Sequence, residues 1–305
     1  MDMYQKREMR KNKKMDENTK SLPSTSINWF PGHMVRAKKE IRENLKLVDA
    51  VIEIVDARIP RSSRNPDFDD LISTKPRVIG LNKFDLADPK VNKMWVDFYK
   101  ERNIPAVLIN SISGVGVKEL LTETAKLVQE KLDRSSERGR IGRSVKVAVI
   151  GIPNAGKSSF INNVAKRKAT IVGNKPGVTR TKQWIRTDSG VELMDTPGIL
   201  WPKFENEEIG FNLAFTGAIR YEILDNEELA LKLIGKLRND YKKELCERYK
   251  LEDISDKTAL EILEAIGNKR GCKVLGGEID YTKVSNIIID EFRKATIGNI
   301  SLERP

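Results

Sequence analysis

The octapeptide GIPNAGKS, residues 151–158, restricts the fold more than any other stretch of this 305-residue chain. It directly follows the β-branched run VKVAVI at 145–150, which is typical of a buried strand. Its glycines allow backbone N–H groups to wrap around phosphates, and Lys157 is placed to reach the outer phosphates. The Ser158 hydroxyl is placed to bind Mg²⁺. The pattern therefore predicts a strand–loop–helix unit that holds a nucleotide.

A second phosphate motif, DTPG at 195–198, ends the predicted strand VELMD. We expect Asp195 to hold Mg²⁺ through water and the Gly198 N–H to meet a γ-phosphate. DxxG alone is a weak pattern. Between the two motifs lies KPGVTRT, residues 175–181, in which Thr179 is placed to complete the Mg²⁺ shell when this loop closes.

A third motif, NKFD at 82–85, ends the apolar run PRVIGLN. A carboxylate at Asp85 can accept two hydrogen bonds, from the N1–H and the 2-amino group of guanine. Adenine lacks both donors, so its binding would leave a buried carboxylate unpaired. Asn82 would support the base edge and the loop, and the Lys83 stem would pack near the nucleotide. A plain surface turn is the alternative for four such residues.

NSISG, at 110–114, also follows a predicted strand, and its Ile112 N–H is a candidate donor to guanine O6. All these motifs stand at the carboxyl ends of strands, where open α/β sheets bind ligands. The chain order, base motif before phosphate loop, indicates a circular permutation. The predicted nucleotide-binding residues are Asn82, Lys83, Asp85, Ser111, Ile112, Asn154, Ala155, Gly156, Lys157, Ser158, Ser159 and Gly198.

Short apolar runs alternate with helical patterns at 89–102 and 116–132, which predicts a mostly parallel sheet with helices on both faces. We expect a circularly permuted P-loop domain over 27–204, with a polar linker at 133–144. Residues 1–26 lack apolar periodicity and predict a disordered basic tail. Residues 205–305 show helical periodicity broken by Gly267, Gly271, Gly276 and Gly277, and predict a small all-helical domain.

The net charge of +11 is unevenly distributed. Residues 205–305 carry 16 Lys/Arg against 20 Asp/Glu, whereas residues 1–204 carry 39 against 24. The segment 159–187 contains seven basic residues and no acid. It fits either a solvated face or a surface that follows nucleic-acid phosphates.

The composition also bears on where the protein works. No apolar run approaches the ~18–20 residues that cross a bilayer, and the N-terminus lacks the apolar core of a signal peptide. Cys246 and Cys272 form no CxxC pair and are expected to be free thiols. We therefore expect a cytoplasmic protein with no membrane contact.

The motif order NKxD, SI-type loop, GxPNxGKS, PGVT and DTPG, together with NWFPGHM at 28–34, resembles that of the circularly permuted YlqF-type GTPases. The resemblance covers about residues 27–305. It implies hydrolysis of GTP to GDP, binding to the large ribosomal subunit and its rRNA during assembly, and a helical C-terminal RNA-binding domain. We expect a monomer away from the ribosome. Residues 1–26 lie outside the pattern, and Ile112 stands where an alanine is common.

The only histidine, His33, stands in a Pro-Gly turn ahead of a helical pattern that starts at Met34. Many GTPases place a water-orienting Gln just after DxxG, but this chain has Ile199, followed by Leu200 and Trp201. A polar group from elsewhere is then needed, and a helix N-terminus would keep the imidazole neutral and able to accept from water. The predicted catalytic residues are His33, Lys157 and Thr179, and the predicted metal ligands are Ser158, Thr179 and Asp195. The alternative for His33 is a turn cap or an RNA contact.

Three questions stay open at the level of the sequence. Resemblance to potassium-activated GTPases suggests that the Asn154 side-chain oxygen binds K⁺ beside the phosphates, with loop stabilisation as the alternative. A pure RNA-binding switch that binds GTP and hardly hydrolyses it is a second class of function, supported by the absence of Gln at 199. A P-loop ATPase is a third class, and Asp85 argues against it.

Overall fold

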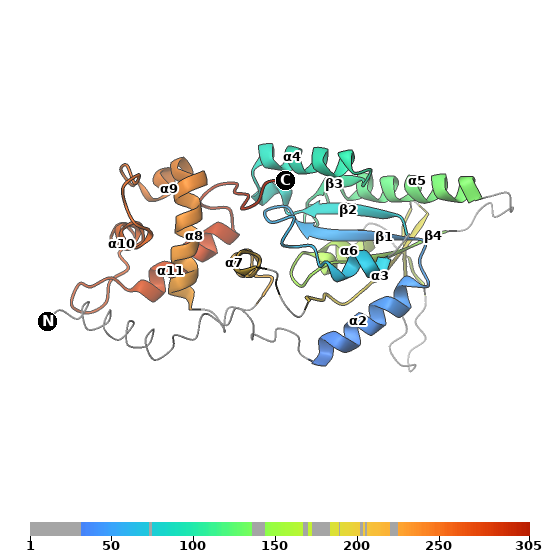
Figure 1. Ribbon diagram of the computed structural model, residues 1–305, viewed down its shortest axis with the longest axis horizontal. Helices are drawn as coiled ribbons and strands as arrows, with labels where there is room; N and C mark the ends of the chain where they lie inside the picture. Colours follow the sequence, from blue (N-terminus) through green and yellow to red (C-terminus); the bar gives the residue numbers. More distant parts are fainter. Residues whose placement is uncertain are drawn as a thin grey trace.

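The computed structural model describes residues 32–72, 75–135, 144–166, 170–172, 184–188, 190–201, 204, 206–219 and 225–305 (Figure 1). The predicted tail, Thr179 and most of the predicted linker lie outside the described residues, as do residues 167–169 and 173–183 of the basic segment. The backbone of His33 is described and its side chain is not.

The core of the first part of the chain is a seven-stranded sheet with the order β3-β2-β1-β4-β7-β6-β5. The strands β3, β2, β1, β4 and β7 are parallel, and β6 runs antiparallel to both β7 and β5. The two strands that the sequence did not predict are β5 and β6, because three residues carry too little periodicity. The strands are β1 (Ala50–Asp56), β2 (Arg77–Asn82), β3 (Ala106–Ile109), β4 (Val145–Ile150), β5 (Thr170–Val172), β6 (Trp184–Arg186) and β7 (Val191–Asp195).

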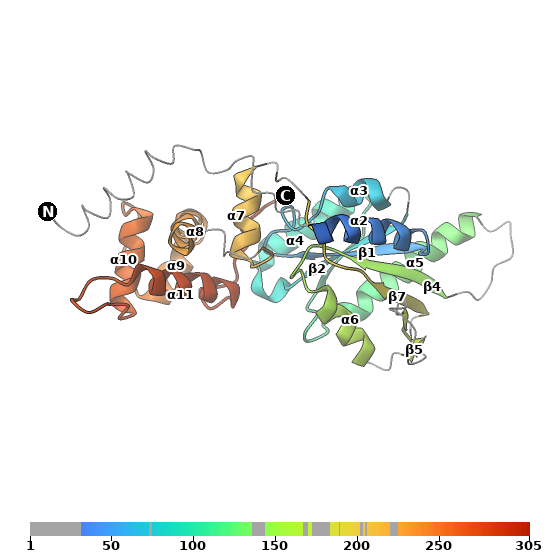
Figure 2. The same cartoon turned by 90° about the horizontal axis from the view of Figure 1, so that it is seen from below.

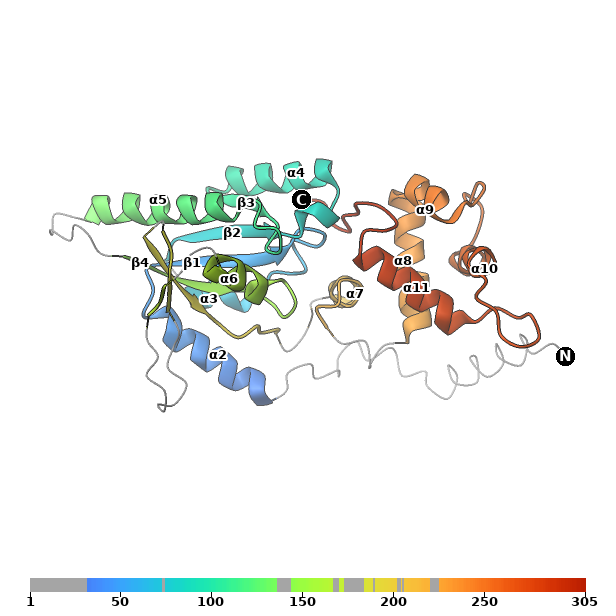
Figure 3. The same cartoon turned by 180° about the vertical axis from the view of Figure 1, so that it is seen from behind.

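Helices cover both faces of this sheet, as Figures 2 and 3 show from two sides. Side chains of α5 and α6 pack on one face with Ile52 and Ile54, and side chains of α2, α3 and α4 pack on the other with Val51 and Val55. All residues of β1 are buried, which explains its almost continuous apolar sequence. The helices are α2 (Gly32–Leu45), α3 (Asp67–Ile72), α4 (Pro89–Glu101), α5 (Val117–Ser135) and α6 (Lys157–Lys166), with the short 3-10 helix η1 (Phe84–Leu86).

The order in which the chain adds strands to the sheet reverses beside β1. The chain steps outward from β1 through β2 to β3, and α5 then carries it back to β4, which pairs with the other edge of β1. A crevice forms at such a reversal outside the carboxyl ends of the strands. The expected mostly parallel sheet with helices on both faces is thus confirmed, and the motif-bearing loops share one edge.

Two boundaries differ from the sequence predictions. Helix α2 starts at Gly32, so His33 lies in its first turn and not in a turn ahead of it. A glycine costs a helix only about 1 kcal/mol, and that cost does not end a helix whose apolar face, with Ile41 and Leu45, is buried. Helix α5 runs to Ser135, which places the first residues of the predicted linker in a helix.

The rest of the described chain is helical, and Figure 1 shows these helices grouped beside the sheet. Helix α8 packs against both α10 and α11 through buried Leu229, Leu233 and Leu237. Gly267 lies inside α10 and does not break it, which corrects the expectation, because one glycine costs a helix only about 1 kcal/mol. Its missing side chain lets Ile279 approach to 3.0 Å from where a Cβ would stand. The domain boundary at 204/205 stays a prediction. The helices are α7 (Glu207–Phe215), α8 (Asn226–Asp240), α9 (Lys242–Tyr249), α10 (Ala259–Lys269) and α11 (Tyr281–Arg293).

The helices of the described residues include no candidate for a membrane-crossing segment.

The packing around α8 predicts that truncating one buried leucine side chain strongly lowers the free energy of unfolding. Leu233→Ala should lower the free energy of unfolding by about 2–5 kcal/mol, because its side chain is fully buried and truncation leaves a cavity. Leu275→Ala is the matched control, since Leu275 is fully exposed and the same truncation should cost under about 0.5 kcal/mol. Urea unfolding measures both. Equal losses would contradict the packing described for α8.

Candidate nucleotide-binding site

The phosphate loop joins β4 to α6, and two of its glycines allow close backbone approaches. Gly156 has a φ of +104°, and a Cβ there would stand 2.1 Å from the Asn82 Nδ2 atom. Gly151 has a φ of +151°, and a Cβ there would stand 2.4 Å from the Ile54 carbonyl oxygen. The loop therefore lies directly against the ends of β1 and β2, which only glycine permits at these positions.

Asn82 connects three of the loops that the sequence assigned to the nucleotide. Its side chain is buried, its Nδ2 donates to the Ala155 carbonyl at 2.7 Å, and its Oδ1 accepts from the Ser111 N–H at 3.0 Å. One amide thus joins the base motif to the phosphate loop and to the NSISG loop. This is the loop-supporting role expected of Asn82. A buried amide with both ends hydrogen-bonded holds such a junction rigidly.

Lys83 also crosses from the base motif to the phosphate loop. Its Nζ donates to the Asn154 carbonyl at 2.8 Å and pairs with the Asp56 carboxylate at 2.9 Å. Lys83 has a φ of 60°, so its backbone is left-handed where the chain turns out of β2. Its stem is thereby directed across the phosphate loop.

The sequence reasoning missed Asp56, the last residue of β1, and Arg58, two residues further on. Both side chains are almost fully buried and paired, with Arg58 Nη2 2.7 Å from Asp56 Oδ2 and Arg58 Nε 2.9 Å from Oδ1. Burial by itself would raise the pKa of Asp56, but Arg58 and Lys83 outweigh it and hold this pKa well below its usual range. The available signal was the sequence DAR at the end of a predicted strand, on the same edge as the other motifs.

Asp85 and Ile112 lie on exposed turns at this edge. The Asp85 carboxylate stands on η1 and makes no hydrogen bond with the described residues. Ile112 is 86% exposed, and its N–H donates to Asn110 Oδ1 at 2.9 Å, a bond with which guanine O6 would compete. The neighbouring Ser111 is buried, and its Oγ has no partner among the described residues.

Lys157 occupies the centre of the phosphate side. Its side chain is buried, and its Nζ donates to the Ile152 carbonyl at 2.9 Å. Desolvation lowers the pKa of Lys157 to about 8, and the Asp195 carboxylate opposes this shift. The DTPG loop touches the same ammonium, since a Cβ on Gly198 would stand 2.7 Å from Nζ. An anion bound here would favour the charged ammonium form of Lys157, which burial disfavours.

Two hydroxyls, of Ser158 and Ser159, are exposed in the first turn of α6. Asn154 has a left-handed φ of 57°, and its Nδ2 donates to the Gly217 carbonyl, just beyond α7, at 2.7 Å. Ile199, Leu200 and Trp201 directly follow DTPG and are buried, and none of the three carries an amide or carboxylate side chain. The structure thus brings the base, phosphate and DTPG loops together.

The buried pair next to Lys83 leads to a prediction on stability. Asp56→Asn should lower the free energy of unfolding at pH 7 by about 3–5 kcal/mol, because Arg58 is left buried without its counter-charge. A lowered pKa stabilises the fold above the ordinary Asp value of 3.8, and this contribution is lost as pH falls through the folded value. We therefore expect the free energies of unfolding of the wild type and of Asp56→Asn, measured in urea, to come closer together as pH falls from 7 to 3.

The matched control is Asp97→Asn, on an exposed part of α4, which should change little at any pH. A loss for Asp56→Asn no larger than that of the control would show that the pair contributes nothing net.

Comparison with known proteins agrees with this geometry. The family model described as "50S ribosome-binding GTPase" matches residues 146–264, from β4 into α10, and leaves out the base motif that precedes the phosphate loop here. Ribosome biogenesis GTPase A of Priestia megaterium is 44% identical over 281 residues, which are 92% of this chain and 97% of that protein.

Two solved structures are also similar. "GDP-bound structue of TM YlqF" matches with a TM-score of 0.63 at 26% identity, over 87% of this chain and 99% of that one. The GNP-bound YlqF from T. maritima matches with a TM-score of 0.59 at 26% identity, over 88% and 98% of the two chains. With the permuted motif order, the shared loop edge and an identity of 44% over nearly the whole chain, this protein belongs to the ribosome biogenesis GTPase A family, the YlqF-type GTPases.

Proposed function

We propose that this GTPase acts in assembly of the large ribosomal subunit and binds rRNA in a manner that depends on its bound nucleotide. The observation that carries the proposal is the direct bonding of Asn82 and Lys83, from the base motif, to the phosphate loop. Base recognition and phosphate recognition are thereby joined in one rigid edge. The family's name and its 50S-binding description support the ribosomal partner.

Guanine recognition is assigned to Asp85, with Asn82 and Lys83 holding its loop. The exposed carboxylate on η1 has no competing hydrogen bond within the described residues, so it is available to the guanine N1–H and 2-amino group. Ser111 and Ile112 line the neighbouring turn. This arrangement supports GTP and GDP as ligands and disfavours adenine nucleotides.

The phosphates are assigned to the loop from Asn154 to Ser159, with Lys157 at its centre and Gly198 opposite. Ser158 lies in the first turn of α6, which follows β4, and Asp195 ends the adjacent strand β7. They offer a hydroxyl and a carboxylate, the hard oxygen donors that Mg²⁺ prefers. Thr179 is the third proposed ligand. When bound, Mg²⁺ would neutralise charge on the phosphate oxygens. K⁺ at Asn154 Oδ1 stays a prediction; the Nδ2 of the same amide is held by Gly217.

Water activation is assigned to His33. Buried Ile199 occupies the place where many GTPases carry a Gln, and its side chain has no group that orients water. His33 lies in the first turn of α2. The first N–H groups of a helix have no partner within the helix, and this positive end disfavours an imidazolium. A neutral ring can accept a proton from water.

The RNA-binding surface is assigned to α2, the basic segment 159–187 and residues 205–305, which we call the helical region. Helix α2 exposes Arg36, Lys39 and Arg42, and the segment exposes Lys166 and Arg186. The helical region has a net charge of −4, so its part in the proposal rests on the family. We propose a cytoplasmic protein that is monomeric away from the ribosome.

The second candidate function is an RNA-binding switch that binds GTP and hardly hydrolyses it. The burial of Ile199 and Trp201 after DTPG favours it, because neither side chain has an amide or carboxylate that could orient a water. Multiple-turnover release of phosphate, with and without ribosomal subunits, separates the two candidates.

Cosedimentation with separated ribosomal subunits tests the proposal as a whole. The protein should pellet with the large subunit more strongly in a non-hydrolysable GTP analogue than in GDP. Its affinity should fall steeply between about 50 and 200 mM salt, because binding of basic residues to phosphates releases counterions. The small subunit is the control. Equal binding in both nucleotides, or an affinity that salt does not change, would contradict the proposal.

His33→Ala tests the catalytic assignment. The variant should keep its affinity for GTP and for subunits and lose turnover by about 10²–10⁴-fold, because only an interaction made in the transition state is removed. Phosphate release is measured with saturating large subunits. Unchanged stimulated turnover would assign His33 to the turn or to an RNA contact, as would a loss confined to subunit affinity.

A further inference from the structure

The last residues of the chain return from the helical region to the nucleotide-binding edge. We call Asn299–Glu303 the C-terminal strap. Two of its backbone N–H groups bond to the loops that follow β2 and β1. The Ile300 N–H donates to the Leu86 carbonyl at 3.1 Å, and the Leu302 N–H donates to the Arg58 carbonyl at 2.8 Å. Figures 1 and 3 show the C-terminus beside α4 and the ends of the strands, away from α9 and α10.

The first residues of the strap hold the turn that carries Asp85. Asn299 Nδ2 donates to the Asp85 carbonyl at 2.6 Å, and the next residue, buried Ile300, donates to Leu86. Ser301 Oγ then accepts from the Asp88 N–H at 3.1 Å. Three consecutive strap residues thus bind the backbone of the base motif and of the turn that follows it.

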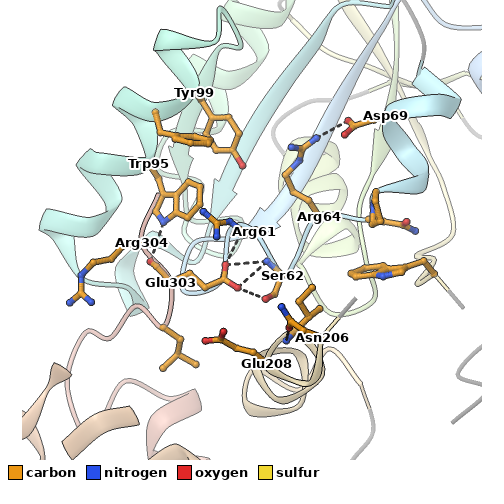
Figure 4. A pocket seen from close by; sticks show the side chains of 16 residues that line it. Arg61, Ser62, Arg64, Asp69, Trp95, Tyr99, Asn206, Glu208, Glu303 and Arg304 are labelled. Atoms are coloured by element: carbon orange, nitrogen blue, oxygen red, sulfur yellow. Dashed lines mark hydrogen bonds and ion pairs between the residues drawn. The ribbon is translucent and has the colours of Figure 1, made fainter. Parts of the chain in front are cut away.

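The last residue of the strap is anchored independently of that turn. Figure 4 shows the Glu303 carboxylate directed into the loop after β1, where it accepts from the Arg61 N–H at 2.7 Å and the Ser62 N–H at 3.1 Å. It also accepts from Asn212 Nδ2 of α7 at 3.0 Å. The Glu303 carbonyl accepts from Trp95 Nε1 of α4 at 3.2 Å. Consecutive backbone N–H groups form a good carboxylate site.

The strap is also tied to the helical region. The buried hydroxyl of Tyr241, at the end of α8, accepts from the Ser301 N–H and donates to the Ser301 carbonyl, both at 3.0 Å. Nearby, the Arg58 guanidinium lies over the Phe292 ring of α11, 5.5 Å from its centroid, and donates to the Arg293 carbonyl at 3.3 Å. A displacement of the helices therefore pulls on the strap.

We propose that the C-terminal strap positions the guanine-recognition turn, so that guanine affinity depends on how the helical region is seated. The Asp85 carboxylate is exposed and makes no hydrogen bond of its own within the described residues, so its direction follows the backbone that Asn299 and Ile300 hold. Holding a loop in its binding conformation lowers the cost of ordering it when the ligand binds. This inference rests on the proposed role of Asp85 in guanine recognition.

Affinities for GDP and for IDP test it, because inosine lacks the 2-amino group assigned to the Asp85 carboxylate. Asn299→Ala should lower the ratio of GDP affinity to IDP affinity by about two- to tenfold, the value of one or two partly exposed hydrogen bonds. Glu303→Gln, at the far end of the strap, should lower it in the same direction and by less. With large subunits saturating, KM for GTP should rise while kcat stays within about twofold.

The matched control is Asn239→Ala, an exposed asparagine in the last turn of α8 with no hydrogen bond to described residues, which should leave the ratio unchanged. In an Asp85→Asn background, Asn299→Ala should have no further effect on the ratio, because the group being positioned is gone. Thermal unfolding of each variant accompanies the measurements, so that a general loss of stability is recognised.

An unchanged ratio in Asn299→Ala and Glu303→Gln would overturn the proposal, whether both affinities stay the same or both fall by the same factor. A different result tests the role of Asp85 itself. If the wild-type protein binds IDP and ADP as tightly as GDP, the guanine assignment fails and the strap proposal fails with it. If the wild type discriminates and the strap variants keep the ratio, only the strap proposal fails.

Discussion

The nucleotide edge depends on one buried amide. Asn82 at the end of β2 donates to Ala155 and accepts from Ser111, and in this way it ties together three loops that belong to three separate parts of the chain. The approach is possible only because Gly156 has no side chain, since a Cβ there would collide with the amide nitrogen. The Asn of the base motif and a glycine of the phosphate loop are thus requirements of the same contact.

A second network closes a ring around the phosphate loop through both parts of the molecule. Asn154 donates to Gly217 after α7, and Arg293 at the end of α11 donates to the Phe215 and Ala214 carbonyls just before it. Arg58 bonds the Arg293 carbonyl and pairs with Asp56, Asp56 pairs with Lys83, and Lys83 returns to the Asn154 carbonyl. The two cations keep Asp56 ionised although it is buried. A change in the phosphate loop therefore reaches α11 from two directions, through α7 and through β1.

Because of the permuted order, the helical region is joined to the nucleotide edge at both of its ends. The helical region follows the DTPG loop after only a few residues, of which Ile199, Leu200 and Trp201 are buried, so α7 begins close to the phosphate side. The other end of the same region runs into the strap on the base side. In an unpermuted order the chain would continue from DTPG to the next strand of the sheet. Here it leaves the sheet and returns to it, so the helices are joined to the phosphate side at one end and to the base side at the other.

The sequence by itself determined the strands that carry the motifs, their helices and the shared edge, because apolar periodicity and the glycines of GIPNAGKS act over a few neighbouring residues. It did not predict β5 and β6, whose three-residue length carries little periodicity, and it misread Gly267, whose place inside α10 depends on Ile279. It also did not single out Asp56, Arg58 or Asn299. Those side chains matter through partners as far as 235 residues away, and only tertiary packing brings such partners within hydrogen-bonding distance. Local chemistry can be read along a chain, whereas a buried ion pair or a strap exists only once the distant segments have met.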